Sequence, residues 1–178
     1  MIQLTPVKIS RDLSFIYRIM TDYEQSSLIV RQLQCNSFED FESWFKNQLK
    51  QYYQRFYMIQ ENGNNLGFVY SYDYNALDRN AKMSLYVLPE YQGLGIGAIA
   101  TILFLHKLFV EVNLKKVYSY VYEYNKKSYE CNVQAGFIQE GCLKEDRYYN
   151  EKFWDMYIFS TTKEVFEDKY KIYIEKYL

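Results

Sequence analysis

The amino-acid sequence predicts a domain of the mixed α/β class, an α+β arrangement in which helices cover both faces of one sheet. The chain has 178 residues, enough for one substantial core. Apolar residues alternate in some segments and recur at helical spacing in others. A strand–helix–strand unit at the centre is flanked by two hairpin-like segments, which favours a mixed sheet. We expect a single domain over residues 1–178.

Composition and charge narrow the class of protein. Charged residues make up 24% and the net charge is −1, without a basic cluster, so we expect no nucleic-acid partner. The three cysteines form no CxxC pair, which argues against disulfides and a metal site. The N-terminus lacks a signal pattern, and no uncharged apolar run is long enough to span a bilayer. We expect a cytoplasmic protein with reduced thiols and no membrane partner.

The N-terminal part of the chain predicts a strand and two helices. Residues 2–7 alternate in polarity and form the first strand. From Ser10 onward, apolar side chains recur at helical spacing and predict a helix. Ser37 is a helix N-cap with acids in the following turn, and it begins the second helix. The core-facing stripe of that helix comprises Phe38, Phe41, Trp44, Phe45 and Leu49.

The middle of the chain predicts a hairpin, a strand and an apolar helix. Residues 56–60 and 66–74 have strand composition and flank the turn at 61–65. Residues 81–88 form the next strand, which Pro89 ends. Residues 96–112 are nearly all apolar, so this helix is buried on several sides.

The C-terminal part completes a sheet of about seven strands, mostly antiparallel. A strand at 117–122 precedes a short helix at 126–134, which Gly136 closes. Residues 137–149 and 153–160 form a second hairpin around the turn at 150–152. Residues 161–164 cap a last helix that reaches the C-terminus.

A glycine-rich segment after Pro89 is the most informative feature of the sequence. Gly93, Gly95 and Gly97 alternate with apolar residues directly before a helix, where free N–H groups and the helix dipole favour an anion. A P-loop is excluded because no Lys-Ser/Thr follows the glycines. A dinucleotide fold is disfavoured because the spacing is wrong, although Glu123 ends the next strand as that fold requires. The segment predicts a phosphate or diphosphate site.

The run Gln92-Gly93-Leu94-Gly95-Ile96-Gly97 resembles the acyl-CoA loop of the GNAT N-acetyltransferase superfamily. The family's "NxxS…GF" segment is similar to Asn125–Ser128 followed by Gly136-Phe137. Residues 138–144 with Asp155 resemble the branch that acetylates ribosomal-protein N-termini, the Rim-type branch. The resemblance covers nearly the whole chain, so the GNAT fold and acetyl-CoA as co-substrate are expected, without a metal.

The resemblance also implies which residues hold the donor. It implies that the CoA diphosphate binds at the loop formed by Gln92, Gly93, Leu94, Gly95, Ile96 and Gly97. The main chain at Val87 and Leu88 is expected to pair with the pantetheine arm, as in strand addition. Asn125 and Ser128 are expected either to contact CoA or to cap their helix. Relatives often place a thiolate-protonating tyrosine where this chain has Asn132, and Ser128 is the expected substitute.

The base and the acceptor residues are less constrained by the sequence. Lys82 and Arg147 occupy positions where relatives have a glutamate. A bulge could bring Glu145 or Asp146 into the site, so Glu145 is the predicted base; deprotonation through ordered water is the alternative. The residues predicted to face the acceptor are Tyr23, Glu24 and Asp73.

The sequence thus predicts an acetyl-CoA-dependent N-acetyltransferase that acts by direct attack in a ternary complex. The expected acceptor is a small amine or a protein N-terminus, and the protein is a possible homodimer. The alternative is a catalytically silent CoA-binding module of the same fold. The departures from the family pattern at Lys82, Asn132 and Arg147 keep that alternative open.

Overall fold

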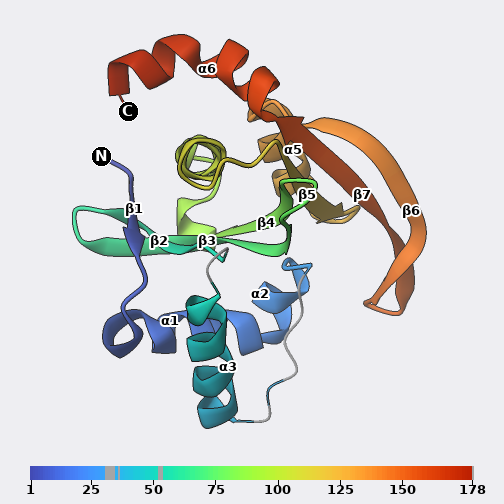
Figure 1. The fold of residues 1–178 in the computed structure, drawn as a ribbon. Coiled ribbons are helices and arrows are strands. Elements are labelled where there is room, and N and C mark those ends of the chain that lie inside the picture. The colour runs from blue at the N-terminus through green and yellow to red at the C-terminus, as the bar shows by residue number, and fades with distance from the viewer. Residues whose placement is uncertain (31–34, 36, 52–53, 178) are drawn as a thin grey trace.

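The computed structural model describes residues 1–178 except 31–34, 36, 52–53 and 178, and describes only the backbone of 171–177. Seven strands form one sheet in the order β1-β2-β3-β4-β5-β7-β6, with helices on both sides (Figure 1). The predicted fold class is therefore confirmed. The strands are β1 (Gln3–Pro6), β2 (Phe56–Glu61), β3 (Asn64–Asn75), β4 (Asn80–Val87), β5 (Lys116–Tyr122), β6 (Ile138–Tyr149) and β7 (Lys152–Thr162).

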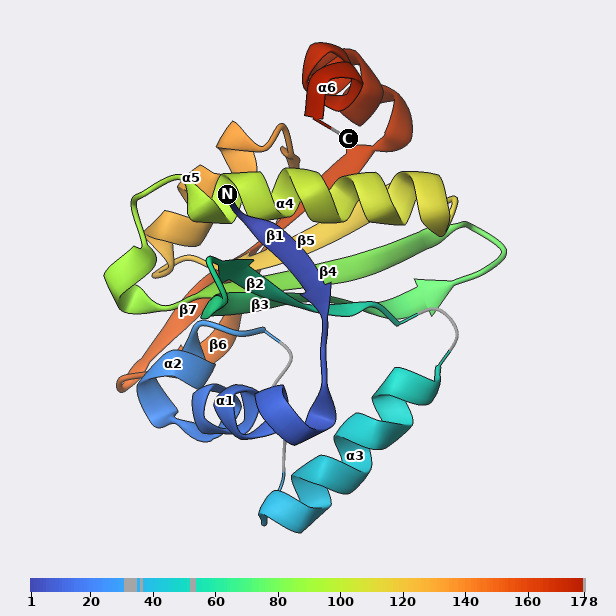
Figure 2. The same ribbon diagram turned by 90° about the vertical axis from the view of Figure 1, so that its left-hand side faces the viewer.

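Neighbouring strands are antiparallel with one exception. β4 and β5 run parallel because the apolar helix α4 (Ile96–His106) connects them as a crossover. The helix continues as a π-helical segment, η2 (Lys107–Glu111), where the sequence predicted one regular helix to residue 112. Figure 2 shows α4 lying across one face of the sheet. Phe104, Leu105 and Phe109 of this long helix are fully buried in the core on that face.

The opposite face of the sheet is covered by α1 (Ile9–Thr21) and α3 (Phe38–Lys50). Phe41 and Phe45 of α3 pack on the sheet as the stripe predicted, and Ser37 caps the helix by accepting the Asp40 N–H at 3.1 Å. α1 begins one residue earlier than its predicted Ser10 start, because the carboxylate of Asp12 accepts the Lys8 N–H at 2.8 Å.

A short helix, α2 (Tyr23–Ser27), occupies a segment that the sequence predicted as a loop. Asp22 caps it by accepting the Gln25 N–H at 2.9 Å. Tyr23 and Glu24 are therefore the first residues of a helix. The helix is short enough that no apolar periodicity marks it in the sequence.

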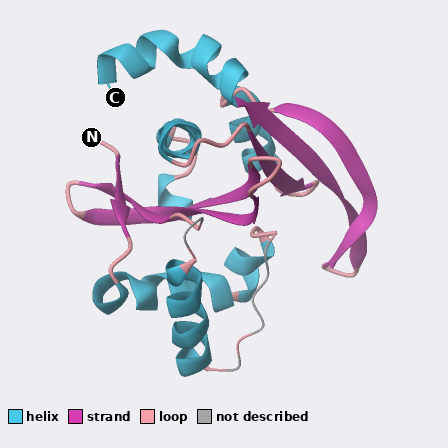
Figure 3. Cartoon of the chain, viewed as in Figure 1, coloured by secondary structure: helices cyan, strands magenta, loops and turns pink. Residues whose placement is uncertain are grey.

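The C-terminal hairpin of β6 and β7 is long and curls away from the rest of the sheet (Figure 3). The helices α5 (Lys126–Gln134) and α6 (Lys163–Tyr177) lie on the α4 side of the sheet. Phe166 of α6 packs against Phe109 of η2, with ring centroids 5.4 Å apart. The tip of the hairpin contacts α2 through the rings of Tyr149 and Tyr23, and the site described below is built there and at the adjoining strand ends.

Candidate active site

The central feature of the site is the place where the parallel strands β4 and β5 part. Their pairing extends only from Asn80 opposite Lys116 to Met83 opposite Ser119. Beyond this point β4 continues on β3, and β5 continues on β7. The far half of β4 therefore has no partner strand on its β5 side, where main-chain groups are open to a ligand.

Alternation along β4 decides which main-chain groups face that opening. The Leu88 N–H donates to Leu66 O of β3 at 2.8 Å, and the Leu88 carbonyl accepts the Tyr91 N–H at 2.9 Å. Main-chain groups of successive residues point to opposite neighbours, so those of Leu85 and Val87 point to the β5 side. Of the two residues predicted to pair with pantetheine, Val87 is thus placed at the opening, whereas the main chain of Leu88 is engaged within the protein.

The glycine-rich loop joins the short 3-10 helix η1 (Pro89–Tyr91) to α4. Gly93 and Gly95 both have φ of +78°, a conformation that residues with a Cβ atom rarely adopt. Nothing lies within 4 Å of a Cβ atom built on either residue, so the space above both is open. No side chain caps α4, and its first intrahelical bond is from Ile99 N–H to Gly95 O at 3.1 Å. The N–H groups at the start of the helix are therefore available to an anion.

Gly97 serves a different purpose from the two glycines before it. A Cβ atom at Gly97 would lie 3.3 Å from the Sγ atom of Cys131 and 3.8 Å from a methyl carbon of Leu85. This glycine lets α4 approach both α5 and the end of β4. The loop therefore stays packed against the strands that form the opening.

Gln92 ties the loop to the elements on either side of it. Its side-chain amide donates to Val87 O at 2.8 Å, and its amide oxygen accepts from Lys127 of α5 at 2.9 Å. One side chain thus fixes the end of β4, the loop and α5 relative to one another. Lys127 also adds a positive charge beside the uncapped start of α4, where the predicted diphosphate would bind.

The predicted residues of α5 lie at the N-terminus of that helix. Asn125 is its N-cap and accepts the Ser128 N–H at 3.2 Å, and its amide also donates to Leu28 O at 3.4 Å. Asn132 is buried and donates to Ser128 O at 2.8 Å, within its own helix. The hydroxyl of the half-buried Ser128 has no hydrogen-bond partner among the described residues.

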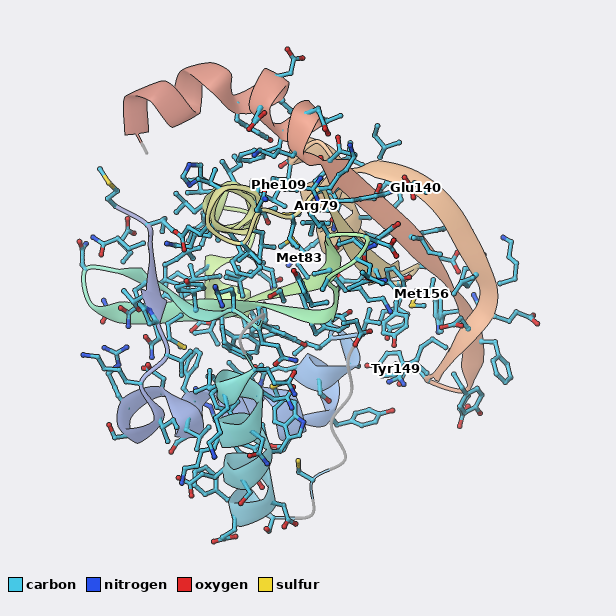
Figure 4. All side chains as sticks on the ribbon, in the orientation of Figure 1. Arg79, Met83, Phe109, Glu140, Tyr149 and Met156 are labelled. Carbon is cyan, nitrogen blue, oxygen red and sulfur yellow. The ribbon has the colours of Figure 1, made fainter. Side chains whose placement is uncertain are left out.

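The predicted acceptor residues are not gathered in one place. Asp73 forms an ion pair of 3.0 Å with Lys82, whose ammonium also lies 4.8 Å from the centre of the Tyr120 ring. Tyr23 packs against Tyr149 at the tip of the hairpin, with ring centroids 5.8 Å apart. Figure 4 shows Tyr149 reaching from the hairpin toward α2. Glu24 is exposed on that helix.

The bulge predicted near Glu145 is present, and it moves Arg147 into the strand position that Glu145 would otherwise take. Leu143 is opposite Met156 and Arg147 is opposite Trp154, so Lys144, Glu145 and Asp146 together face the single residue Asp155. Without the two extra residues, Glu145 would be opposite Trp154.

Asp155 organises this bulge through its carboxylate. It accepts the Glu145 N–H at 3.0 Å and the Lys144 ammonium at 2.7 Å. These bonds, the Lys144 ammonium foremost, lower the pKa of the Asp155 carboxyl. Glu145 itself has a positive φ of 53° and an exposed side chain with no contact to Ser128 in the described part of the chain.

A cluster of aromatic side chains, not foreseen from the sequence, forms the wall between α2 and the hairpin. The Tyr124 ring stacks on those of Tyr122 and Tyr149, with centroids 5.4 and 4.9 Å away, and meets Trp154 edge-on at 5.4 Å. The Tyr124 hydroxyl donates to Ser27 O at 2.6 Å. Burial raises the pKa of Tyr124 to about 12, so this hydroxyl stays protonated at neutral pH.

A second tyrosine holds α2 from the side of β4. The Tyr86 hydroxyl donates to the amide oxygen of Gln25 at 2.7 Å. Burial, with the nearby carboxylate of Asp22, raises the pKa of Tyr86 to about 12. Tyr86 from β4 and Tyr124 from the turn after β5 thus hold α2 at two points, Gln25 and Ser27.

The cysteines are poor nucleophiles in this arrangement. Burial raises the pKa of the Cys131 thiol, and burial together with Asp155 raises that of Cys142. Among the described residues, no group of His, Cys, Asp and Glu side chains is arranged to hold a metal ion. Within the same residues, every helix is too short or too polar to cross a lipid bilayer.

Comparisons with known proteins agree with this geometry. The sequence profile described as "Acetyltransferase (GNAT) family" matches residues 14–137. Spermidine N(1)-acetyltransferase of Vibrio cholerae is 27% identical over 164 residues, covering 89% of this chain and 94% of that protein. The N-acetyltransferase YokL of Bacillus subtilis is 26% identical over 131 residues, 74% of either chain.

Solved structures show the same fold. The crystal structure of spermidine N-acetyltransferase from Vibrio cholerae in complex with CoA and spermine superimposes with a TM-score of 0.85 at 23% identity, covering 93% of this chain and 97% of that one. The relatives from Vibrio cholerae and Escherichia coli are spermidine N(1)-acetyltransferases, so the comparisons support the GNAT family but not specifically the ribosomal-protein branch that the sequence resembled.

Proposed function

The chain belongs to the acetyltransferase (GNAT) family and is an acetyl-CoA-dependent N-acetyltransferase, and from this premise we propose that its acceptor is a small primary amine. The opening between β4 and β5 beside an uncapped helix start supports binding of the donor. The observation that supports a small-amine acceptor best is the similarity to spermidine acetyltransferases, which act on a small amine. Since the chain is an enzyme of this family, the alternative of a catalytically silent CoA-binding module is set aside.

We propose that the donor is held along the opening. The free N–H groups at the start of α4 suit the diphosphate, and Lys127 adds a charge of the matching sign. The pantetheine arm would pair with the β5-facing main-chain groups of Leu85, as an added strand does, because the Val87 carbonyl already accepts the Gln92 side chain. These contacts fix the thioester carbonyl next to β4, and the Val87 N–H supplies a donor for the oxyanion that develops there.

Direct attack accounts for the transfer with the groups present. The neutral amine forms a bond to the thioester carbon, the C–S bond then breaks, and the amine proton is lost to water or a nearby base. Ser128 has a free hydroxyl at the start of α5 and is proposed to donate to the leaving thiolate. An acetyl-cysteine intermediate is disfavoured, because burial raises the pKa of the Cys131 thiol.

The general base is proposed to be ordered water rather than a fixed carboxylate. Glu145, the predicted base, is exposed in the bulge, and Lys82 occupies the position where relatives have a glutamate. Asp146 contributes a negative charge near the Tyr122 hydroxyl, where it raises the pKa of that phenol less than burial does. The negative charge of Asp146 can stabilise the water molecule that takes up the proton from the amine.

A protein N-terminus is the second acceptor class, suggested by the resemblance of residues 138–144 and Asp155 to the ribosomal-protein branch. In the structure these residues hold one another, with Cys142 Sγ 3.5 Å and Lys144 Nζ 2.7 Å from the Asp155 carboxylate. Their packing explains their presence without an acceptor. We therefore rank small amines ahead of peptides.

The test is release of free thiol from acetyl-CoA in the presence of small amines, polyamines and peptides with free N-termini. We expect turnover with at least one small amine and less with every peptide. Turnover with peptides alone would move the function to the second class. Binding of CoA without thiol release from any acceptor would contradict the proposal.

A homodimer is proposed from the exposed surface of the hairpin. Ile138, Leu143, Tyr148 and Phe153 are all at least 40% exposed, and β6 is an edge strand of the sheet. A second hairpin packing here would cover this apolar surface. Light scattering on the purified protein is expected to give twice the chain mass, and a shift to the monomer for Phe153→Asp.

A further inference from the structure

Arg147 of β6 lies beside the aromatic wall. The bulge in β6 sets it opposite Trp154, on the strand position that Glu145 would take in a regular hairpin. Its guanidinium carbon lies 5.4 Å from the centre of the Tyr122 ring. It also lies close enough to the Tyr124 hydroxyl to lower the pKa of that phenol, against the larger effect of burial. Tyr122 is the last residue of β5 and Tyr124 lies in the turn that follows, beside the opening where the thioester is proposed to lie.

The guanidinium of Arg147 has no counterion within the described part of the chain. None of the ion pairs found there includes it, and its Nε–H is buried with no hydrogen-bond partner. Asp155, the acid of the bulge, is already paired with Lys144. A half-buried arginine without an anion is costly, because the charge loses hydration and gains only neutral partners, the Tyr122 ring and the Tyr124 hydroxyl. The aromatic wall stabilises the cation only in part.

The nearby acids do not compensate for Arg147. Asp73 is paired with Lys82, Asp22 accepts the Gln25 N–H at the start of α2, and Glu123 accepts the Asp155 N–H at 3.4 Å. The tyrosine hydroxyls of the wall are neutral donors and acceptors. Glu24, Glu145 and Asp146 are exposed and can attract an ammonium group. Exposed acids therefore accompany a half-buried cation.

We propose that the acceptor carries an anionic group, a carboxylate or a phosphate, on the same short skeleton as its amine, and that Arg147 binds this group. The inference rests on the proposed function and names its substrate class. A guanidinium forms paired, charge-assisted hydrogen bonds with either anion. A polyamine has no such group and brings only positive charge to Arg147, so it is the poorer substrate for this chain.

The experiment compares acceptors that differ only in the anionic group. Amino acids of increasing chain length are paired with their amides, and phosphoethanolamine is paired with ethanolamine; spermidine is included. With the wild-type protein, we expect kcat/KM for the anionic member of at least one pair to exceed that of its neutral partner by about 10- to 100-fold, the range for hydrogen bonds to charged groups. Whether the amino-acid or phosphate pair shows the preference identifies the anion.

Two variants assign the preference to Arg147. Arg147→Gln is expected to remove the difference between the members of a pair, and Arg147→Lys to retain part of it. Lys126→Gln is the control, since it removes one positive charge from an exposed lysine of α5 that has no contact with the bulge among the described residues, and it should leave the preference intact. Calorimetry with CoA checks that each variant is folded.

Several outcomes would overturn the inference while the proposed function stands. These are equal turnover of both members in every pair, spermidine as the best acceptor, or a preference that survives in Arg147→Gln. Absence of thiol release with every amine would instead reject the proposed function, and this inference with it.

Discussion

Ser128 and Asn125 show how two polar residues at one helix start take separate tasks. Asn125 caps α5 through its side chain, and Ser128 contributes its N–H to that cap while its hydroxyl stays free. The sequence left cap and ligand contact as alternatives for both. The structure assigns the cap to Asn125, which leaves the Ser128 hydroxyl for the proposed proton donation.

Ser128→Ala is expected to lower kcat on the order of 100-fold, because proton transfer to the leaving group contributes at least that much. The KM for acetyl-CoA should change little, since the cap is intact. Asn125→Ala is the contrasting variant: it should lower the free energy of unfolding by about 1 kcal/mol through the lost cap. Steady-state kinetics and urea denaturation measure the two effects. An unchanged kcat in Ser128→Ala would exclude its proposed role.

At the scale of elements, the sequence predicted the helix starts with different success, and the contacts at each start explain why. Ser37 begins α3 as predicted, because its side chain accepts the Asp40 N–H only three residues further along the chain. The start of α1 was misplaced because Asp12, inside the helix, reaches back to Lys8. α2 was missed although Asp22 caps it locally, because five residues are too few to show an apolar period, and the bonds from Tyr86 and Tyr124 that hold it come from distant parts of the chain.

The link between α5 and the glycine-rich loop gives a prediction with a close control. Lys127→Ala removes the bond to Gln92 and a positive charge beside the loop, so we expect the Kd for CoA to rise by roughly 10-fold. Lys126→Ala removes the neighbouring exposed lysine, which does not contact Gln92 in the described structure. Since it removes only a solvent-screened charge, it should raise the Kd for CoA by less than about 3-fold. Calorimetry compares the two. Equal effects would mean that only net charge matters here.

The buried carboxylate at the start of α1 predicts how stability depends on pH. Burial alone would raise the pKa of Asp12, but hydrogen bonds from the Arg11 guanidinium and the Lys8 N–H outweigh it and lower the pKa below 3.8. The ionised form therefore contributes stability above the unfolded value, and this is lost as the pH falls through the folded pKa.

Asp12→Asn should accordingly lower the free energy of unfolding at pH 7 by about 1–3 kcal/mol, the range for a hydrogen-bonded charged group. The difference from the wild type should shrink as the pH falls below about 3.8. Urea denaturation at both pH values measures it. A difference that is the same in acid would show that the side chain acts through packing instead of charge.

For the whole molecule, the sequence predicted the parts that depend on order along the chain. The seven strands, the crossover helix and the loop at Gln92–Gly97 follow from periodicity and glycine spacing, and the structure agrees. The acceptor side depends instead on register. Two extra residues opposite Asp155 exchange Glu145 for Arg147, and pairing across β5 and β7 gathers the aromatic wall. The sequence predicted a bulge near Glu145 but not its length, and the aromatic wall depends on contacts between distant segments that no local pattern encodes.

The account depends on the glycine-rich loop as the binding site for the donor, and calorimetry of CoA binding to two glycine variants tests it most directly. Gly95→Val and Gly63→Val both place a branched side chain at positive φ, +78° and +81°, with nothing within 4 Å of the new Cβ atom. Each should cost roughly 1–2 kcal/mol of stability from backbone strain. Gly63 lies in the turn between β2 and β3, outside the segment 92–97. We predict that Gly95→Val loses CoA binding while Gly63→Val binds like the wild type; undiminished binding by Gly95→Val would contradict the account.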